Sequence, residues 1–244
     1  MTVATGAVYV YGIVPAGARW GVDGDAPPVD VVTSGPISAV VAAVTSERPF
    51  GLAEDLRNHD RVVAWFVERG VPILPMRFGM VIADRETIER DVLEANAERY
   101  GRALKDLEGL VQYILQVRYE PDGVLRAVVR ENPEIAAARS AAQQAGSANR
   151  SAQLKLGELV VGAIGRRREV DAAGIQQRID EFVEDLHCTV IDDPESVADL
   201  ACLVRTDRVA EFEAAAEAIA ADRAAMMRLK LLGPLAPYDF VPDS

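Results

Sequence analysis

Three side chains that commonly bind metal ions lie in the second half of the chain: His187, Cys188 and Cys202. Structural zinc sites use three or four nitrogen or sulfur ligands, usually with a close pair such as C-x-x-C. Here the two cysteines are far apart in sequence and no close pair exists. We therefore interpret both cysteines as small core residues and expect no metal site.

His59 is followed directly by Asp60, and a carboxylate can orient an imidazole for base catalysis. The surrounding pattern predicts a helix, however, and adjacent helical residues do not face each other. No serine or cysteine stands in a recognisable nucleophile elbow. We expect no catalytic residue in this chain.

Nucleotide-binding motifs are also missing. Neither G-x-x-x-x-G-K-[ST] nor a G-x-G-x-x-G between a strand and a helix occurs. The nearest glycine cluster, Gly157, Gly162 and Gly165, falls inside a predicted helix, where we interpret it as allowing close approach to a neighbour. The sequence therefore favours a binding protein over an enzyme, and we expect no cofactor.

The run from Val71 to Val81 (VPILPMRFGMV) places two prolines, an arginine and a glycine among apolar residues. Pro75 cannot donate a hydrogen bond to a sheet, and Arg77 is rarely buried without a partner. The run predicts a strand, a fixed kink and a turn at Arg77-Phe78-Gly79. We expect a carboxylate or backbone carbonyls to hold the Arg77 guanidinium.

The single basic run is Arg166-Arg167-Arg168, within a long predicted helix. We interpret it as a solvated helix face paired with nearby glutamates. A docking patch for an acidic partner is the alternative.

The net charge is −12, from 26 basic and 38 acidic residues. An excess of this size argues against nucleic acid and anionic membranes as partners. Half of the residues are apolar, which is typical of folded globular proteins. The first residues lack the features of a signal peptide, and no window resembles a membrane span. We expect a cytoplasmic location.

The first half of the chain alternates apolar strand-like runs with amphipathic helical patterns. We expect strands at 7–14, 37–44 and 72–75, and helices at 52–69 and 85–107. Gly70 and Gly109 are expected to end the two helices. The apolar face of the first helix is expected to contain Leu52, Leu56, Val62, Val63, Phe66 and Val67, and that of the second Ile88, Val92, Leu93, Tyr100, Leu104 and Leu107.

From residue 110 the expected order is strand, helices, two strands, helix and strand, which is the pattern of a ferredoxin-like α+β sandwich with extra helices. Strands are expected at 111–119, 188–191, 198–205 and 226–232. Helices are expected at 122–131, 133–145, 151–186 and 208–222, with Gly146-Ser147 as a break, Asp192-Asp193-Pro194 as a turn and Asp207 as a helix cap. The fold class is α+β in two domains, 1–108 and 109–244. We expect the Pro-rich tail 233–244 to pack back on the protein, because its apolar residues would otherwise be exposed.

Three separated motifs resemble the GvpF/GvpL family of gas vesicle proteins. They are Tyr9-Val-Tyr11-Gly12-Ile-Val-Pro15, a helix containing His59 followed by Leu74-Pro75-Met76-Arg77-Phe78-Gly79, and Gly233-Pro234-Leu235-Ala236-Pro237-Tyr238-Asp-Phe240-Val241. Ala236 and Met80 depart from the family's common residues. The resemblance spans nearly the whole chain, and it rests on the order and spacing of the motifs.

The resemblance implies a modified ferredoxin-like first domain and a non-enzymatic accessory or minor component of gas vesicles. It also implies binding to the apolar shell protein GvpA, protection of that protein from aggregation, and contact with other accessory proteins. The candidate contact or motif residues are Tyr9, Tyr11, His59, Arg77, Phe78, Gly79 and Tyr238. The alternative is a small-molecule-binding or enzymatic ferredoxin-like domain that uses His59 and Arg77 around an anionic ligand.

The preferred contact surface is the β-rich first domain, where Tyr9, Tyr11 and the strand at 37–44 are expected to build a sheet with an accessible edge. The helical face with Arg166–Arg168 is the second possibility.

Overall fold

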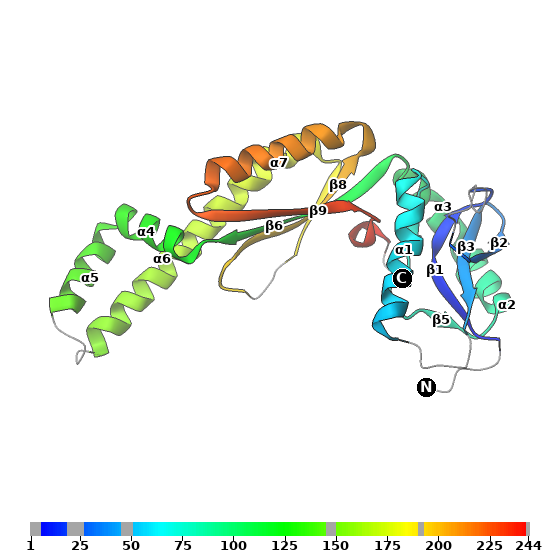
Figure 1. The fold of residues 1–244 in the computed structure, drawn as a ribbon, viewed down its shortest axis with the longest axis horizontal. Helices are drawn as coiled ribbons and strands as arrows, with labels where there is room; N and C mark the ends of the chain where they lie inside the picture. The colour runs from blue at the N-terminus through cyan, green and yellow to red at the C-terminus, as the bar shows by residue number, and fades with distance from the viewer. Residues whose placement is uncertain (1–5, 19–26, 45–50, 145–149, 190–192, 243–244) are drawn as a thin grey trace. The chain divides into compact units, whose positions relative to one another are not determined.

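A computed structural model describes residues 6–18, 27–44, 51–144, 150–189 and 193–242 (Figure 1). The chain divides into two compact units. The first contains residues 1–113, 205–207 and 233–244, and the second contains residues 114–204 and 208–232. The mixed α+β class is confirmed. The tail 233–244, expected in the second domain, groups with the first unit, because its described side chains bond to residues there.

The first unit is built on an antiparallel sheet with the order β2-β3-β1-β4, in which β5 also pairs with β1. Its strands are β1 (Val8–Pro15), β2 (Asp30–Ser34), β3 (Ile37–Ala43), β4 (Leu74–Pro75) and β5 (Val81–Ile82). The expected strands at 7–14 and 37–44 are confirmed. Strand β2 was not predicted, because it is short and half of it faces solvent.

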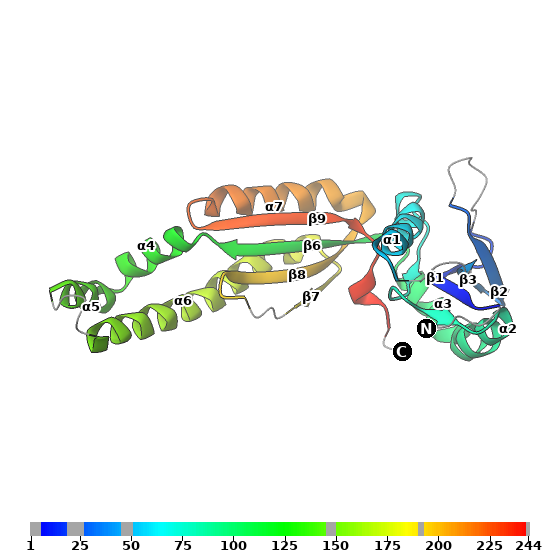
Figure 2. The ribbon, with the colours of Figure 1, turned by 60° about the horizontal axis from the view of Figure 1, so that its bottom comes forward.

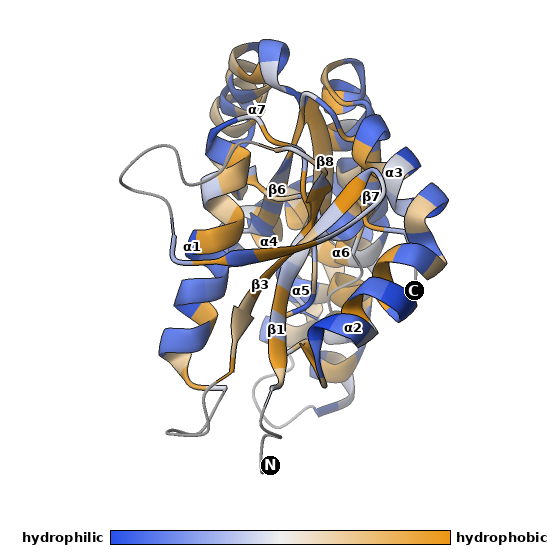
Figure 3. Ribbon diagram, turned by 90° about the vertical axis from the view of Figure 1, so that its right-hand side faces the viewer, coloured by the Kyte–Doolittle hydropathy of each residue, from blue (hydrophilic) through white to orange (hydrophobic). Residues whose placement is uncertain are grey.

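Strand β1 has neighbours bonded to both of its edges, and its colour in Figure 3 runs between orange and pale. Its residues from Val8 to Val14 are all buried. Strand β3 lies between β2 and β1, so it has no open edge either. Tyr9, Tyr11 and the strand at 37–44 do belong to one sheet, as expected, but the outer strand beside β3 is β2. Both tyrosines are core residues.

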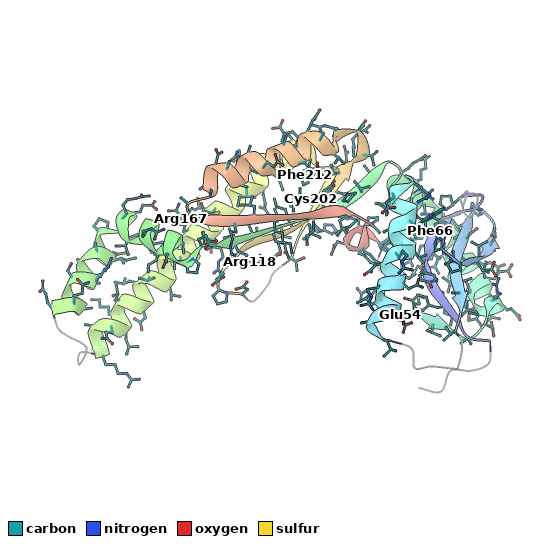
Figure 4. All side chains as sticks on the ribbon, in the orientation of Figure 1. Glu54, Phe66, Arg118, Arg167, Cys202 and Phe212 are labelled. Carbon is teal, nitrogen blue, oxygen red and sulfur yellow. The ribbon has the colours of Figure 1, made fainter. Side chains whose placement is uncertain are left out.

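Helix α1 (Ala53–Glu68) packs its buried face, which includes His59, Val62 and Phe66, into the core of the first unit (Figure 4). The Asp55 carboxylate caps its start by accepting the backbone N–H groups of Gly51 and Leu52 at 2.9 and 3.0 Å. Gly70, with φ +67°, follows its last residues as predicted. Leu52 and Leu56, however, are exposed rather than buried, since they lie off the face that contacts the sheet.

The expected helix at 85–107 is broken into four helical pieces. They are α2 (Arg85–Thr87), a π-helical turn (Ile88–Leu93), a 3₁₀ turn (Glu94–Asn96) and α3 (Ala97–Asp106). All six residues of the predicted apolar stripe are nevertheless buried. The π turn and the 3₁₀ turn change the winding of the backbone, which a pattern of apolar spacing does not reveal.

The second unit consists mainly of a four-stranded sheet and four helices. In chain order its elements are β6 (Leu110–Tyr119), α4 (Pro121–Glu131), α5 (Pro133–Gln144), α6 (Arg150–Ile179), β7 (Asp185–Cys188), β8 (Ser196–Arg205), α7 (Val209–Arg223) and β9 (Met227–Leu235). The strand order is β7-β8-β6-β9. The central strands, β6 and β8, are the first and third of the βαββαβ series, as in ferredoxin-like folds. Helix α7 packs through the fully buried Phe212, and Cys202 is fully buried in β8 (Figure 4).

Two expected boundaries in this unit are wrong. The helix expected at 151–186 ends at Ile179, and β7 begins at Asp185 because Leu186 pairs with Cys202 in β8. Helix α7 has Arg208 rather than Asp207 as its N-cap, and the Asp207 carboxylate accepts hydrogen bonds from the Arg205 guanidinium. The expected break at Gly146-Ser147 and the Asp192 position of the expected turn lie outside the described residues.

Candidate functional site

A buried imidazole lies between two tyrosine hydroxyls in the first unit. Nδ1 of His59 is 2.7 Å from Oη of Tyr9, and its Nε2 is 2.8 Å from Oη of Tyr238. A neutral imidazole can donate through one ring nitrogen and accept through the other, and a hydroxyl can do either. Both ring nitrogens are thereby satisfied, although His59 is only 1% exposed.

Aromatic rings surround this imidazole. The Tyr11 ring is stacked on His59 with centroids 5.8 Å apart, and Phe78 meets it edge-on at 5.9 Å. Tyr9 and Tyr11 themselves contact edge-to-face at 4.8 Å. Such contacts add to the stability obtained from burial alone. We call the set of Tyr9, Tyr11, His59, Phe78 and Tyr238 the His59 cluster.

Strand β1 has a β-bulge at the second of its two tyrosines. The register with β3 shifts between Val10 and Gly12, so Tyr11 is an extra residue in the strand. At Gly12 a Cβ would lie 2.8 Å from side-chain carbons of Ile73 and from the Leu74 carbonyl oxygen. Only glycine therefore lets β4 approach β1 closely enough to form this core.

The turn after β4 brings Phe78 and Gly79 to the cluster. Gly79 has φ +97°, a conformation that favours glycine, and its backbone N–H donates to Oη of Tyr9 at 3.4 Å. The Tyr11 hydroxyl accepts a hydrogen bond from Nδ2 of Asn58 at 2.9 Å. The β1 motif thus contacts both α1 and the turn after β4.

The C-terminal tail completes the cluster. Gln112 holds the tail at both polar groups of Asp239: its amide NH₂ donates to the carboxylate, and its carbonyl accepts the Asp239 backbone N–H at 3.1 Å. Ala236 is buried in the same core as Tyr9 and Phe66. The expectation that the tail packs back on the protein is confirmed. Gln112 and Asp239 gave no sequence signal that they pair.

Burial keeps the groups of this cluster uncharged. It lowers the pKa of His59 below its ordinary value of 6.5, an effect that the Asp60 charge and a hydrogen bond to Met76 oppose. It raises the pKa of Tyr9 to about 12 and also raises the pKa values of Tyr11 and Tyr238. A neutral imidazole between two protonated hydroxyls is a hydrogen-bonded anchor for the fold, and no nucleophile lies among the named partners.

The structure therefore brings together six of the seven candidate residues: Tyr9, Tyr11, His59, Phe78, Gly79 and Tyr238. Arg77 is the exception. Its side chain is exposed and, among the described residues, makes no ion pair. The expectation of an anchored Arg77 is wrong, because the turn aims this side chain outward while Met76 and Phe78 face the protein.

The basic run in α6 is tied into the second unit. Arg167 pairs with Glu131 and with Asp171, whose carboxylate also accepts from Oη of Tyr119 at 2.9 Å and from Arg223 at 3.2 Å. Arg168 donates to the Pro194 carbonyl. Asp171 is a buried charge that the sequence pattern does not reveal, since two of its partners, Tyr119 and Arg223, come from other elements, β6 and α7.

The expectation that both cysteines are small core residues is confirmed for Cys202 but wrong for Cys188, which is exposed. Burial raises the pKa of the Cys202 thiol to about 12. Within the described ranges no group of three histidine, cysteine or acidic residues could hold a metal ion. None of the described helices is long and apolar enough to cross a membrane.

Two solved structures have this fold. The crystal structure of GvpF from Anabaena sp. PCC7120 superposes with a TM-score of 0.83, covering 98% of this chain and 99% of that one at 18% identity. The GvpF structure from Microcystis aeruginosa gives 0.78, covering 97% of this chain and 99% of its own at 21% identity.

Sequence relatives agree. A gas vesicle protein F from Streptomyces sp. (strain CB03234) is 32% identical over 243 residues, covering 96% of this chain and 98% of the relative. A second, from Dolichospermum flosaquae, is 20% identical over 198 residues, covering 80% and 79%. The family model described as gas vesicle synthesis protein GvpL/GvpF matches residues 7–242. The chain belongs to the GvpL/GvpF family of gas vesicle synthesis proteins.

Proposed function

We propose that this protein binds the gas vesicle shell protein GvpA and keeps it from aggregating while vesicles are nucleated and assembled. It does so without catalytic turnover, at the gas vesicle and in the cytoplasm. The observation that carries the proposal is the family match over residues 7–242. Other gas vesicle accessory proteins are further candidate partners.

The net charge of −12 suits this role. A shell protein that polymerises through apolar surfaces aggregates when those surfaces meet prematurely. A partner of high net charge that covers them keeps the complex in solution by mutual repulsion.

The environments of His59 and Arg77 favour a binding role over the small-molecule alternative. His59 is buried and both ring nitrogens contact tyrosine hydroxyls, while Arg77 is exposed. An anionic ligand would need both side chains at one accessible place. Their separation into core and surface supports a structural role for the His59 cluster.

We place the contact surface on the first unit, at α1 and the tail. Leu52 and Leu56 are exposed on α1, and Leu235 and Tyr238 are exposed in the tail. Leu56 lies three residues before His59 on the helix, and Tyr238 bonds to His59, so both side chains lie next to this histidine. Exposed apolar groups at this position give the shell protein a surface to dock on.

Two leucines of nearly equal exposure provide a matched test: Leu56 is 44% exposed and Leu125, in α4 of the second unit, is 43% exposed. Shell protein diluted from denaturant should scatter less light when the full chain is present at micromolar concentration, with no nucleotide added. Leu56→Gln should weaken this protection and the retention of shell protein on the immobilised chain, whereas Leu125→Gln should leave both unchanged.

Two results would count against the proposal in different ways. If the intact chain neither retains the shell protein nor lowers scattering, the chaperone function is wrong. If Leu125→Gln is the damaging change, binding occurs but through the second unit.

A further inference from the structure

The first half of α6 presents an uncovered apolar stripe in the second unit. Leu154 and Val161 are exposed, with Val161 at 71%, and Gly157 lies between them on the same helix face. Together with Arg150, Gln153 and Glu158 they form a shallow, open surface on α6 itself. We call Leu154, Gly157 and Val161 the α6 stripe.

The stripe lies on the part of α6 that the sheet does not cover. The buried residues Asp171, Ile175 and Ile179 belong to the second half of the helix, and Ala163 is the buried residue nearest to the stripe. Figure 2 shows α5 and the first half of α6 extending past the end of β6 within this unit. The stripe is thus not part of the sheet's core.

Gly157 is not required by the packing of its own unit. A Cβ at this position would meet no atom within 4 Å. Glycine in a helix interior is less stable than alanine. Gly157 therefore weakens α6, and no packing contact within the described residues requires it. The expectation that this glycine admits a close neighbour is not met inside the described chain, and the free space beside it can receive the backbone of another helix.

The segment that contains the stripe has a net charge of opposite sign to the rest of the protein. Residues 121–179 contain nine basic and six acidic residues, whereas the remainder contains 17 basic and 32 acidic ones. At the stripe itself Arg150 and the exposed Lys155 outnumber the one acidic neighbour, Glu158. A partner of acidic character is therefore attracted to this region.

We propose that the α6 stripe binds an amphipathic helix of another protein, with its apolar face against Leu154 and Val161 and acidic residues on its flanks. Two helices pack against each other through apolar residues spaced three or four apart, and the glycine permits close backbone approach. A second copy is the less favourable occupant, because a symmetric contact would bring two basic regions together. This surface is separate from the one proposed for the shell protein.

The probe is a synthetic helix of about 18 residues with leucine and alanine on one face and glutamate on both flanks. Its counterpart has the same apolar face with lysine flanks. Fluorescence anisotropy with the full chain should show the glutamate peptide binding about tenfold more tightly than the lysine peptide at low salt. The preference should shrink as salt is raised, because the attraction is screened.

Val161 and Val170 are a matched pair for this test. They are 71% and 72% exposed, and they lie nine residues apart on α6, which places them on opposite faces. Val161→Gln should weaken binding of the glutamate peptide about tenfold. Val170→Gln should leave binding unchanged, and circular dichroism should show both variants folded.

Three outcomes would overturn the proposal. One is absence of glutamate-peptide binding, another is equal binding of both peptides, and the third is equal sensitivity to the two valine substitutions. Sedimentation that shows a dimer abolished by Val161→Gln would assign the stripe to a second copy instead.

Discussion

Nε2 of His59 lies 2.8 Å from Oη of Tyr238, although the two residues are 179 positions apart. The contact joins α1 to the C-terminal tail, and Tyr9 meets the other ring nitrogen from β1. The first unit is therefore completed by the last residues of the chain. Its stability should depend on the charge of one imidazole and on the presence of the tail.

Acidification should destabilise the protein through His59. Burial lowers its pKa from 6.5 in the folded state, so below that pH the unfolded chain binds a proton that the folded chain does not. The free energy of unfolding should fall as the pH drops below about 6.5, until the folded pKa is reached.

The measurement is urea unfolding of the wild type and His59→Gln, which keeps a donor and an acceptor, at pH values of about 7.5 and 5.5. The stability of the wild type relative to the variant should be lower at about pH 5.5 than at about pH 7.5. A difference that stays constant with pH would show that this imidazole does not titrate differently on folding.

Removing residues 234–244 should lower the melting temperature, because it removes the buried Ala236 and the Tyr238–His59 hydrogen bond. Each kcal/mol lost corresponds to about 2–4 °C for a chain of this size. Tyr238→Phe keeps the ring and removes only the hydroxyl, and it should cost about 1 kcal/mol. An unchanged melt after truncation, together with weaker shell-protein binding, would make the tail a binding arm instead.

Gly12→Ala should destabilise the first unit by about 2 kcal/mol, since the added methyl group would overlap Ile73 and the Leu74 backbone. Gly101→Ala is the control, because it lies inside α3 and its Cβ would meet nothing within 4 Å. That change should raise stability by about 0.5–1 kcal/mol through helix propensity. Chemical unfolding of both variants measures the contrast, and equal effects would contradict the close approach of β4.

Asp171→Ala should destabilise the second unit by about 3 kcal/mol, because it leaves Arg167 and Arg223 facing an apolar gap and removes the acceptor for Tyr119. Glu98→Ala removes an exposed carboxylate that pairs with Arg102 along α3, and it should change stability little. Thermal unfolding followed by circular dichroism should separate the two variants. Similar melting temperatures would mean that the Asp171 network is weaker than its burial implies.

The sequence by itself predicted the elements whose pattern is local. The stripe from Ile88 to Leu107 predicted which residues are buried, because one buried helix face imposes a period of 3.6. The three motifs predicted the family, and six of their candidate residues meet in one cluster. Gly70 and Gly109 marked helix ends, since both have positive φ values.

Only the tertiary structure decided how those elements meet. Tyr9 and Tyr11 are core residues because His59 of α1 packs on both rings and Phe78 packs on Tyr9, and such distant contacts leave no local mark in the sequence. Leu52 and Leu56 belong to a helical pattern that looks continuous, yet the sheet covers only part of it. Arg77 faces solvent because of the direction of one turn. His59 bonds to Tyr238, and Gln112 bonds to Asp239, because the tail packs on the first unit. Contacts between residues this far apart in the chain form only in the folded protein, so the local sequence pattern does not predict them.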